Sequence, residues 1–384
     1  MTLTGRHDGP PLGPPAPLVP RLHDLHAALT RLSGRTMPDP LGLLVERASI
    51  AGFTRRGDIS CGGATRILRT ATGWMVVTLA RADDVDAVPA WLELDDVPRD
   101  PWAAVADAAR TRDGDELDAR AALLGLPVAV LPSPLPSPRV GPPPFHELPV
   151  GAARFGPASA TRAATRAAPL VVDLSSLWAG PLCSRLLRLA GARVVKVESR
   201  TRPDGARNGP PAFFALLNDG KEQRTFDFTR HDDLAALRAL LVDADVVIEG
   251  SRPRALRQLG IHAEELLRAE DGPTVWLSIT GHGRDGDGAD RVAFGDDAAV
   301  AGGLVVWDDD GPCFCADAVA DPVTGLTAAV AAMTALASGE RWLVDVAMAH
   351  AARHLAGPTL PVPASLMAGQ MAPASRSAAM SSHE

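Results

Sequence analysis

Asp321 is the residue of this chain best placed to act as a nucleophile. It stands in CADAVADPVTGLTAAVAAMTAL, directly before Pro322 and an apolar run long enough to predict a helix. Aspartate followed by proline is also how many helices begin, so a capping role is the more common reason for this pattern. The two roles are compatible, because a helix N-terminus stabilises a carboxylate and keeps it ionised for attack.

Four arginines follow predicted strand ends, which is where α/β proteins bind their ligands. Arg200, Arg202 and Arg207 come after one strand, and Arg252 comes after another. Arginine binds phosphates and carboxylates through charge-assisted hydrogen bonds, so these loops are candidates for an anion site. A solvated charged face is the alternative explanation.

Three other patterns have plainer explanations than a cofactor or metal site. The segment GHGRDG, residues 281–286, matches the dinucleotide pattern GxGxxG, but no helix begins after it to hold a pyrophosphate. The run DGDGAD resembles a calcium loop, yet it has Ala289 at a ligand position and lacks the closing glutamate. The four cysteines include one C-F-C without a second pair at zinc spacing. We therefore expect no NAD site, no metal site and reduced thiols.

The composition is that of an ordinary globular protein. Of 384 residues, 46% are apolar and 22% charged, and the formal net charge of -8 argues against a nucleic-acid partner. The first twenty residues lack the apolar core of a signal peptide, and no uncharged apolar stretch of roughly 18 residues predicts a membrane span. We expect a cytoplasmic protein with no membrane partner.

Strands and helices alternate in the second half of the chain. The predicted strands are Leu170–Leu174, Val194–Val197, Thr225–Phe228, Val246–Glu249 and Val275–Ile279, and the predicted helices lie near 181–190, 231–242 and 261–268. This alternation predicts an α/β fold with a Rossmann-like, doubly wound parallel sheet. The loops after Leu174, Val197 and Glu249 should then face a ligand crevice.

Proline content sets the expected domain boundaries. The stretch LPSPLPSPRVGPPP, residues 131–144, cannot form a helix or a central strand and predicts a linker. Before it, two strands around a Thr-Gly turn, two helices and the strand in LPVAVLP predict a small α+β domain. We expect a disordered N-terminus at 1–20, the small domain at 21–130, a linker at 131–168, the large domain at 169–358 and a disordered tail at 359–384.

Several segments taken in order resemble a known family. They are DLSxxxAGPxC, GARVVKVE, the pair Asp204 and Arg207, LNDGKEQRTFDF, ADVVIEGSRPRALRQLGI, WLSITGHGRDG, ADPVTGLTAA and VDVAMAHAA. This order, over about residues 170–352, resembles the class III coenzyme A transferases of the CaiB/BaiF type. GGATRILRTATGWMVVTLARADD and ELDARAALLGLPVAVL resemble small-domain segments that relatives carry after the large domain, so the chain resembles a rearranged member.

The resemblance implies a fold, a reaction and an assembly. Relatives form interlocked homodimers and move CoA between an acyl-CoA and a carboxylic acid through a covalent aspartyl intermediate. The family's D-x-x-x-G segment corresponds to Asp321–Gly325, which makes Asp321 the implied catalytic residue. CoA, as substrate and carrier, is the ligand that the resemblance implies.

The implied CoA-binding residues lie in the strand-end loops. They are Leu177, Trp178 and Ala179 near the adenine, Arg200, Arg207 and Lys221 near the phosphates, and Gly250 and Ser251 in the third loop.

The chain also departs from the family pattern. Gly250 and Ser251 stand where relatives often have Asn-Phe, and Phe294 and Gly295 stand where the racemase branch has histidine and an acid. The sequence does not show whether Asp296 or Asp297 replaces that acid. A CoA-transferase is the leading hypothesis. The alternatives are a non-catalytic, degenerate CoA-binding protein, an acyl-CoA racemase or isomerase, and, more distantly, a nicotinamide dehydrogenase.

Overall fold

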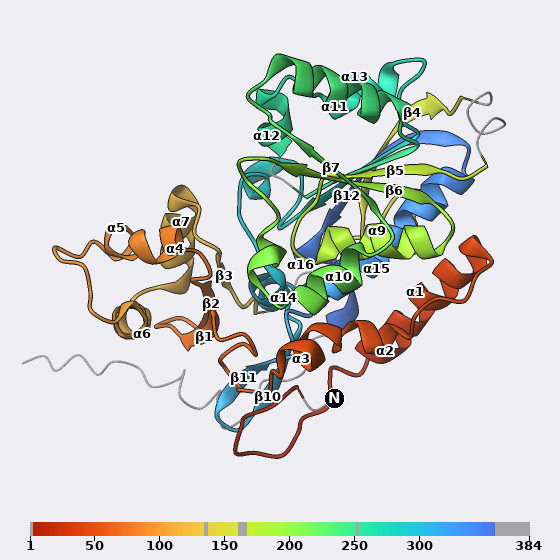
Figure 1. The fold of residues 1–384 in the computed structure, drawn as a ribbon. Helices are drawn as coiled ribbons and strands as arrows, with labels where there is room; N and C mark the ends of the chain where they lie inside the picture. The colour runs from red at the N-terminus through yellow and green to blue at the C-terminus, as the bar shows by residue number, and fades with distance from the viewer. Residues whose placement is uncertain (1–2, 134–136, 160–166, 251–252, 358–384) are drawn as a thin grey trace, which may run out of the picture.

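A seven-stranded sheet forms the centre of the protein (Figure 1). The computed structural model describes residues 3–133, 137–159, 167–250 and 253–357. The strand order is β4-β12-β9-β8-β5-β6-β7, and all neighbours are parallel except β4 and β12. The strands are β4 Gly151–Pro157, β5 Leu170–Asp173, β6 Arg193–Ser199, β7 Glu222–Phe226, β8 Val246–Glu249, β9 Val275–Thr280 and β12 Glu340–Ala347.

The order of the parallel strands confirms the predicted doubly wound sheet. Taken from one edge, it runs β7-β6-β5-β8-β9-β12, which is the Rossmann order with its switch point between β5 and β8. Strands β5, β6, β8 and β9 lie close to their predicted positions, because each is buried and mostly apolar. Strand β7 begins three residues before the predicted Thr225, since its first four residues are exposed and polar.

Helices cover both faces of this sheet (Figure 1). Val171 packs on one side and Val172 on the other, as expected for a strand buried on both faces. The first side carries α9 Ala179–Leu189, α10 Pro211–Asn218, α15 Ala320–Ala337 and α16 Met348–Ala356. The second side carries α11 His231–Asp243, α12 Pro253–Gln258 and α13 Ala263–Arg268. Two short turns of 3-10 helix, Gly205–Asn208 and Gly286–Gly288, lie in the connecting loops.

The N-terminal segment packs on the large sheet domain, which differs from the prediction. It contains α1 Leu18–Ser33, α2 Pro40–Leu43 and α3 Glu46–Ala51. Helix α1 buries one apolar stripe, Leu18, Leu22, Leu25 and Leu29, in the core that also holds α15. Upstream of α1, the hydroxyl of Thr4 is buried and accepts a hydrogen bond from the Ala316 N–H. The expected disordered segment 1–20 and a small domain starting at 21 are therefore corrected.

The small α+β unit spans about residues 64–131 and precedes the large domain in the chain. Its antiparallel sheet has β1 Thr65–Arg69, β2 Trp74–Thr78 and β3 Val128–Val130, with the predicted Thr-Gly turn between the first two. Its helices are α4 Ala82–Asp86, α5 Val88–Leu92, α6 Pro101–Thr111 and α7 Gly114–Leu124.

This unit packs against a later part of the chain, α14 Gly295–Ala301 and the hairpin β10 Val305–Asp308 and β11 Gly311–Phe314. Ile67 and Val76 of the unit share one apolar cluster with Val300 and Phe314. The buried interface fixes how the two parts sit on each other (Figure 1).

The predicted linker, 131–168, is partly built into the large domain. Phe145 is fully buried and meets Trp342 edge to face, with ring centroids 5.0 Å apart. Strand β4 pairs along β12 at the edge of the sheet. Proline prevents helix and central-strand formation, but it does not prevent this edge strand or the packing of one aromatic ring. Residues 134–136 and 160–166 of this segment, and the predicted tail 359–384, lie outside the described residues.

The packing of α1 on α15 predicts a difference between two leucines of the same helix. Leu29 is fully buried, whereas Leu32 is 37% exposed. We expect Leu29→Ala to lower the free energy of unfolding by about 2–5 kcal/mol, because it leaves a cavity in the core. Leu32→Ala should change it by less than about 1 kcal/mol. Urea unfolding followed by circular dichroism measures both, and equal midpoints for the two variants would contradict this packing.

Candidate active site

Asp321 lies in the first turn of α15, where that helix packs against the start of α9. Helix α15 begins at Ala320, so Asp321 is inside the helix and does not cap it as the pattern predicted. A Cβ atom at Gly325 would lie 2.7 Å from the Ala179 carbonyl oxygen, so only glycine lets the two helices approach this closely. The backbone N–H of Ala179 lies close enough to the Asp321 carboxyl to favour its ionised form. Asp321 and Gly325 therefore both lie where the start of α15 contacts the start of α9.

This contact lies at the ligand-binding edge of the sheet. Helix α9 follows β5, and Gly250 follows β8, which are the two strands at the switch point. A Cβ at Gly250 would be 3.1 Å from the Ser175 Cβ, so the loops after β5 and β8 touch. Asp321 is therefore beside the crevice where open α/β sheets bind ligands.

Two other carboxyls and one guanidinium surround Asp321. Arg47 of α3 donates to both carboxylate oxygens of Asp317, from Nε at 2.8 Å and from Nη2 at 2.5 Å. Asp296 of α14 accepts a 3.0 Å hydrogen bond from the Ala318 N–H. Arg47, Asp296 and Asp317 each influence the ionisation of Asp321, so we call these four residues the carboxyl cluster.

Burial raises the pKa of Asp321 to about 7. The neighbouring carboxyls Asp296 and Asp317 raise the pKa further, while Arg47 and the Ala179 N–H oppose them. Burial also raises the pKa of Asp296 to about 6. Asp321 is half-buried, so it keeps access to solvent while most of its hydration is removed. A carboxyl with these properties changes its charge near neutral pH.

Asp297 has a different role from its neighbour Asp296. It is fully buried and accepts hydrogen bonds from the Phe294 N–H at 2.9 Å and from the Thr78 hydroxyl at 3.0 Å. Burial raises its pKa to about 8. Asp297 thus caps α14 and ties it to the small unit.

The backbone around the cluster is held in unusual conformations. Leu177, Ala316 and Ala318 have φ angles of 70°, 59° and 43°, in the left-handed region that side chains other than glycine rarely adopt. Such strain is often found at functional sites. At Gly295 a Cβ would lie 2.3 Å from Oδ2 of Asp321, so the lack of a side chain at this position lets the start of α14 lie against the carboxyl.

Of the three residues expected near an adenine, only Leu177 is accessible. Its side chain is 41% exposed, and its N–H donates to Asp204 at 2.9 Å. Trp178 is 2% exposed and packs edge to face on Phe213, and Ala179 is also buried. The expectation for Trp178 and Ala179 is corrected, because both side chains are buried in the core where the start of α9 packs.

Two of the arginines expected to meet phosphates are open to solvent. Arg200 is 64% exposed, and its nearest carboxylate oxygen, on Asp233, is 3.9 Å away. Arg207 donates two hydrogen bonds to Glu198 and lies 4.1 Å from the centroid of the Phe214 ring, yet its side chain stays 42% exposed. Arg202 is exposed as well, while Ser251 and Arg252 lie outside the described residues.

Lys221 has a structural role, which corrects the expectation that it binds phosphate. Its side chain is fully buried. The ammonium donates to Ser184 Oγ at 2.7 Å, to the Pro181 and Asn218 oxygens at 2.9 and 3.0 Å, and to Asp173 at 3.3 Å. These acceptors use all three N–H donors of the ammonium group. Lys221 therefore connects the start of α9 to β5.

The segment GHGRDG is a turn with a structural arginine. Arg284 pairs with Glu249 at the end of β8 and donates to Ser278 at 2.6 Å, and all three residues are buried. Only a short 3-10 turn, Gly286–Gly288, follows. Within the described ranges, no cluster of three or more His, Cys, Asp or Glu side chains is arranged to hold a metal ion.

Sequence reasoning missed Arg47 and Asp317. Asp317 lies four residues before Asp321 and carried no pattern of its own. Arg47 stands in the unremarkable run VERASIAG, and its partner is 270 residues further along the chain. Only the folded chain brings the two together.

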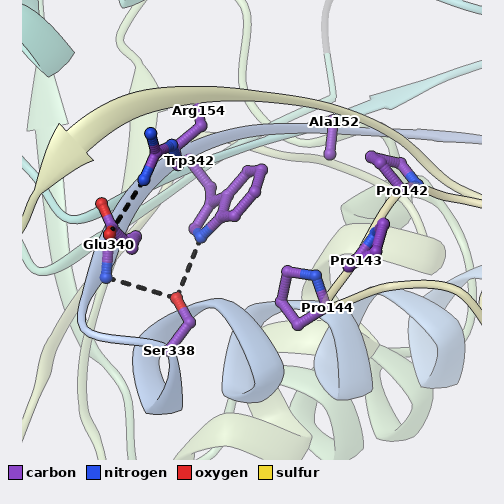
Figure 2. A pocket seen from close by; sticks show the side chains of 8 residues that line it. All are labelled: Pro142, Pro143, Pro144, Ala152, Arg154, Ser338, Glu340 and Trp342. Atoms are coloured by element: carbon purple, nitrogen blue, oxygen red, sulfur yellow. Dashed lines mark hydrogen bonds and ion pairs between the residues drawn. The ribbon is translucent and has the colours of Figure 1, made fainter.

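An open groove of about 610 Å³ lies elsewhere (Figure 2). It is lined by Pro142–Pro144, Ala152 and Arg154 and by Ser338, Glu340 and Trp342. In Figure 2 the Trp342 indole donates to Ser338, and Arg154 pairs with Glu340. The groove lies beyond the C-terminal end of α15, a helix about 27 Å long, whereas Asp321 is at its N-terminal end. It therefore has no part in the carboxyl cluster.

Helix α15 is long and apolar enough to cross a membrane by length and composition, but 72% of that window is buried inside the fold. It packs as a core helix between α9 and α1.

The buried role of Lys221 predicts a loss of stability on its replacement. Lys221→Met leaves the Asp173 carboxylate buried without its partner and should lower the free energy of unfolding by about 3–5 kcal/mol. Arg200→Met, at an exposed position, should change it by less than about 0.5 kcal/mol. Urea unfolding compares the two variants. A Lys221→Met protein as stable as the parent would rule out the structural role.

The raised pKa of Asp321 predicts a pH-dependent stability difference. Between its ordinary value of 3.8 and about 7, the folded state keeps a proton that the unfolded state loses, so stability falls as pH rises through this window. Asp321→Asn cannot ionise and escapes this loss. At about pH 8 it should be more stable than the parent by up to about 4 kcal/mol, and near pH 4 the two should nearly match. Urea unfolding at both pH values, with exposed Asp309→Asn as control, tests this; a difference independent of pH would contradict it.

Comparison with known proteins matches the second half of the chain. The model of CoA-transferase family III covers residues 169–383. The chain is 28% identical over 190 residues to a succinyl-CoA–D-citramalate CoA-transferase of Chloroflexus aurantiacus, which covers 46% of this chain and 47% of that protein. It is 32% identical over 200 residues to a succinate–glutarate CoA-transferase of Agrobacterium fabrum, covering 46% and 49%.

Among solved structures, a CaiB/BaiF family protein from Brucella suis is 30% identical, with a TM-score of 0.45, and the match covers 48% of this chain and 53% of that one. The chain spans about half the length of the curated relatives it matches. Because the family model matches more than half of its residues, this chain belongs to CoA-transferase family III.

Proposed function

We propose that this protein transfers CoA between an acyl-CoA and a carboxylic acid, with Asp321 as the nucleophile. The observation that supports this most is the Asp321 carboxyl itself. It is half-buried at the start of α15, beside the switch point of the sheet, and the nearby Ala179 N–H favours its ionised form. A carboxylate that is held in one orientation and largely stripped of water is a better nucleophile than one in bulk solvent.

The proposed reaction passes through covalent intermediates on Asp321. One carboxylate oxygen attacks the thioester carbonyl carbon, the C–S bond breaks, and a mixed anhydride and CoA thiolate form. The thiolate attacks the Asp321 carbonyl carbon of the anhydride, which gives an aspartyl-CoA thioester and releases the first acid. The acceptor carboxylate attacks this thioester, the thiolate leaves again, and its attack on the acceptor's carbonyl carbon forms the new acyl-CoA and restores the Asp321 carboxylate.

The residues around Asp321 have separate tasks in this proposal. The Ala179 N–H and the N-terminal end of α15 stabilise the carboxylate before attack and after release. The close backbone at Gly295 restricts the direction from which a thioester can approach Oδ2. The exposed face of Arg207, with Arg200 nearby in the chain, is the proposed contact for the CoA phosphates, and Leu177 offers an apolar surface to the adenine.

The remaining expectations are part of the same proposal. We propose a cytoplasmic homodimer, interlocked as the family resemblance implies, with CoA as carrier and neither NAD nor a resident metal ion in the reaction. We also propose that the small unit at residues 64–131 corresponds to the small domain of relatives, placed ahead of the large domain. Its position in front of α14 leaves its sheet packed on the element that carries Asp296.

Covalent trapping tests the proposed nucleophile. The purified protein is incubated with a panel of acyl-CoAs and quenched with hydroxylamine or borohydride, and peptides are analysed by mass spectrometry. We expect modification at Asp321 in the parent and none in Asp321→Asn, whose amide cannot attack. Transfer by Asp321→Asn should fall by at least about a thousandfold.

The matched control is Asp309→Asn, which changes an exposed carboxyl that is not part of the cluster and should leave transfer unchanged. CoA binding without any adduct across the panel would instead indicate a non-catalytic CoA-binding protein. Exchange of the α-proton in deuterated water without CoA transfer would indicate a racemase.

A further inference from the structure

We propose that Arg47 is a positioning residue for the Asp321 carboxylate, an inference that rests on the proposed role of Asp321 as nucleophile. Arg47 comes from the N-terminal segment, far in sequence from the family-matching residues 169–383. It contacts Asp317, in the turn that leads into α15, and Trp178, at the start of α9.

The first contact is a two-pronged ion pair. Both nitrogen atoms that bond to Asp317 lie within 2.8 Å of a carboxylate oxygen, and the Asp317 side chain is fully buried. This fork geometry fixes the orientation of both groups. Asp317 is flanked by Ala316 and Ala318, the residues with left-handed backbone, so Arg47 holds the strained turn that leads into α15.

The second contact is with the loop that leads into α9. The Arg47 guanidinium lies 4.9 Å from the centroid of the buried Trp178 indole, a distance suited to a cation–π interaction. Trp178 directly precedes Ala179, whose N–H favours the ionised form of Asp321. The Arg47 guanidinium therefore contacts both the start of α9 and the turn that leads into α15.

The charge of Arg47 also offsets three carboxyls. Asp296 and Asp317 both disfavour the ionised form of Asp321, and Arg47 is the cation that favours it. Burial raises the pKa of the nearby Cys61 thiol to about 12, so this group adds no charge at neutral pH. Without Arg47, the proton on Asp321 would be held to higher pH.

Titration of Asp321 tests the proposal without any substrate. The protein is labelled with ¹³C at aspartate side chains, and the Asp321 signal is assigned by its loss in Asp321→Asn. We expect Arg47→Met to raise the titration midpoint of Asp321 by about one pH unit or more. Arg47→Lys keeps the charge but loses the fork, so its shift should be smaller. The midpoint of the pH profile for adduct formation should move with the NMR midpoint.

The control breaks a different ion pair of the same helix. Arg185 pairs with Glu46, next to Arg47, at 2.9 Å, so Arg185→Gln loosens α3 without removing charge from the cluster. It should leave the Asp321 midpoint in place. If Arg47→Met does not fold, Asp317→Asn is compared with Asp317→Asn/Arg47→Met, and the second should have the higher midpoint. A folded protein without Arg47 whose Asp321 midpoint is unchanged would overturn the proposal, whereas a parent protein that titrates as expected but forms no adduct would contradict only the proposed function.

Discussion

The close approach of α9 and α15 is the constraint on which the site depends. Gly325 removes the side chain that would keep the helices apart, and the Ala179 N–H then reaches the Asp321 carboxyl. The switch point of the sheet puts the start of α9 at the ligand edge, and the tight helix contact puts α15 there too. A larger residue at 325 would separate donor and acceptor even if the sheet remained intact.

The residues that sequence could place are those whose environment is local. Strands β5, β6, β8 and β9 are buried on both faces and so appear as mostly apolar runs. The motif D-x-x-x-G keeps its spacing because its two ends are about one helix turn apart. Residues whose surroundings come from partners far along the chain could not be assigned a role from the sequence. Lys221 has the charge of a phosphate ligand but the surroundings of a core residue, and β4 is an exposed edge strand without alternation. The role of Arg47 can be recognised only once the fold brings it beside Asp317.

The two parts of the chain are joined by more than a linker. Asp297 of the large domain bonds Thr78 of the small unit, and Arg291 pairs with Asp118 across the same boundary. Asp296, one residue before Asp297, belongs to the carboxyl cluster. A shift of the small unit would therefore act on α14 and, through it, on the surroundings of Asp321.

The placement of Arg47 in the N-terminal segment also bears on how the protein folds. Its partner Asp317 is 270 residues away, and Thr4 and Ala316 are separated by 312. Closing such long loops is entropically costly, and such contacts form slowly compared with those inside a helix. On the ribosome, the N-terminal helices emerge long before the residues they must meet. We expect the carboxyl cluster to be among the last parts of the molecule to assemble, after the sheet itself has formed.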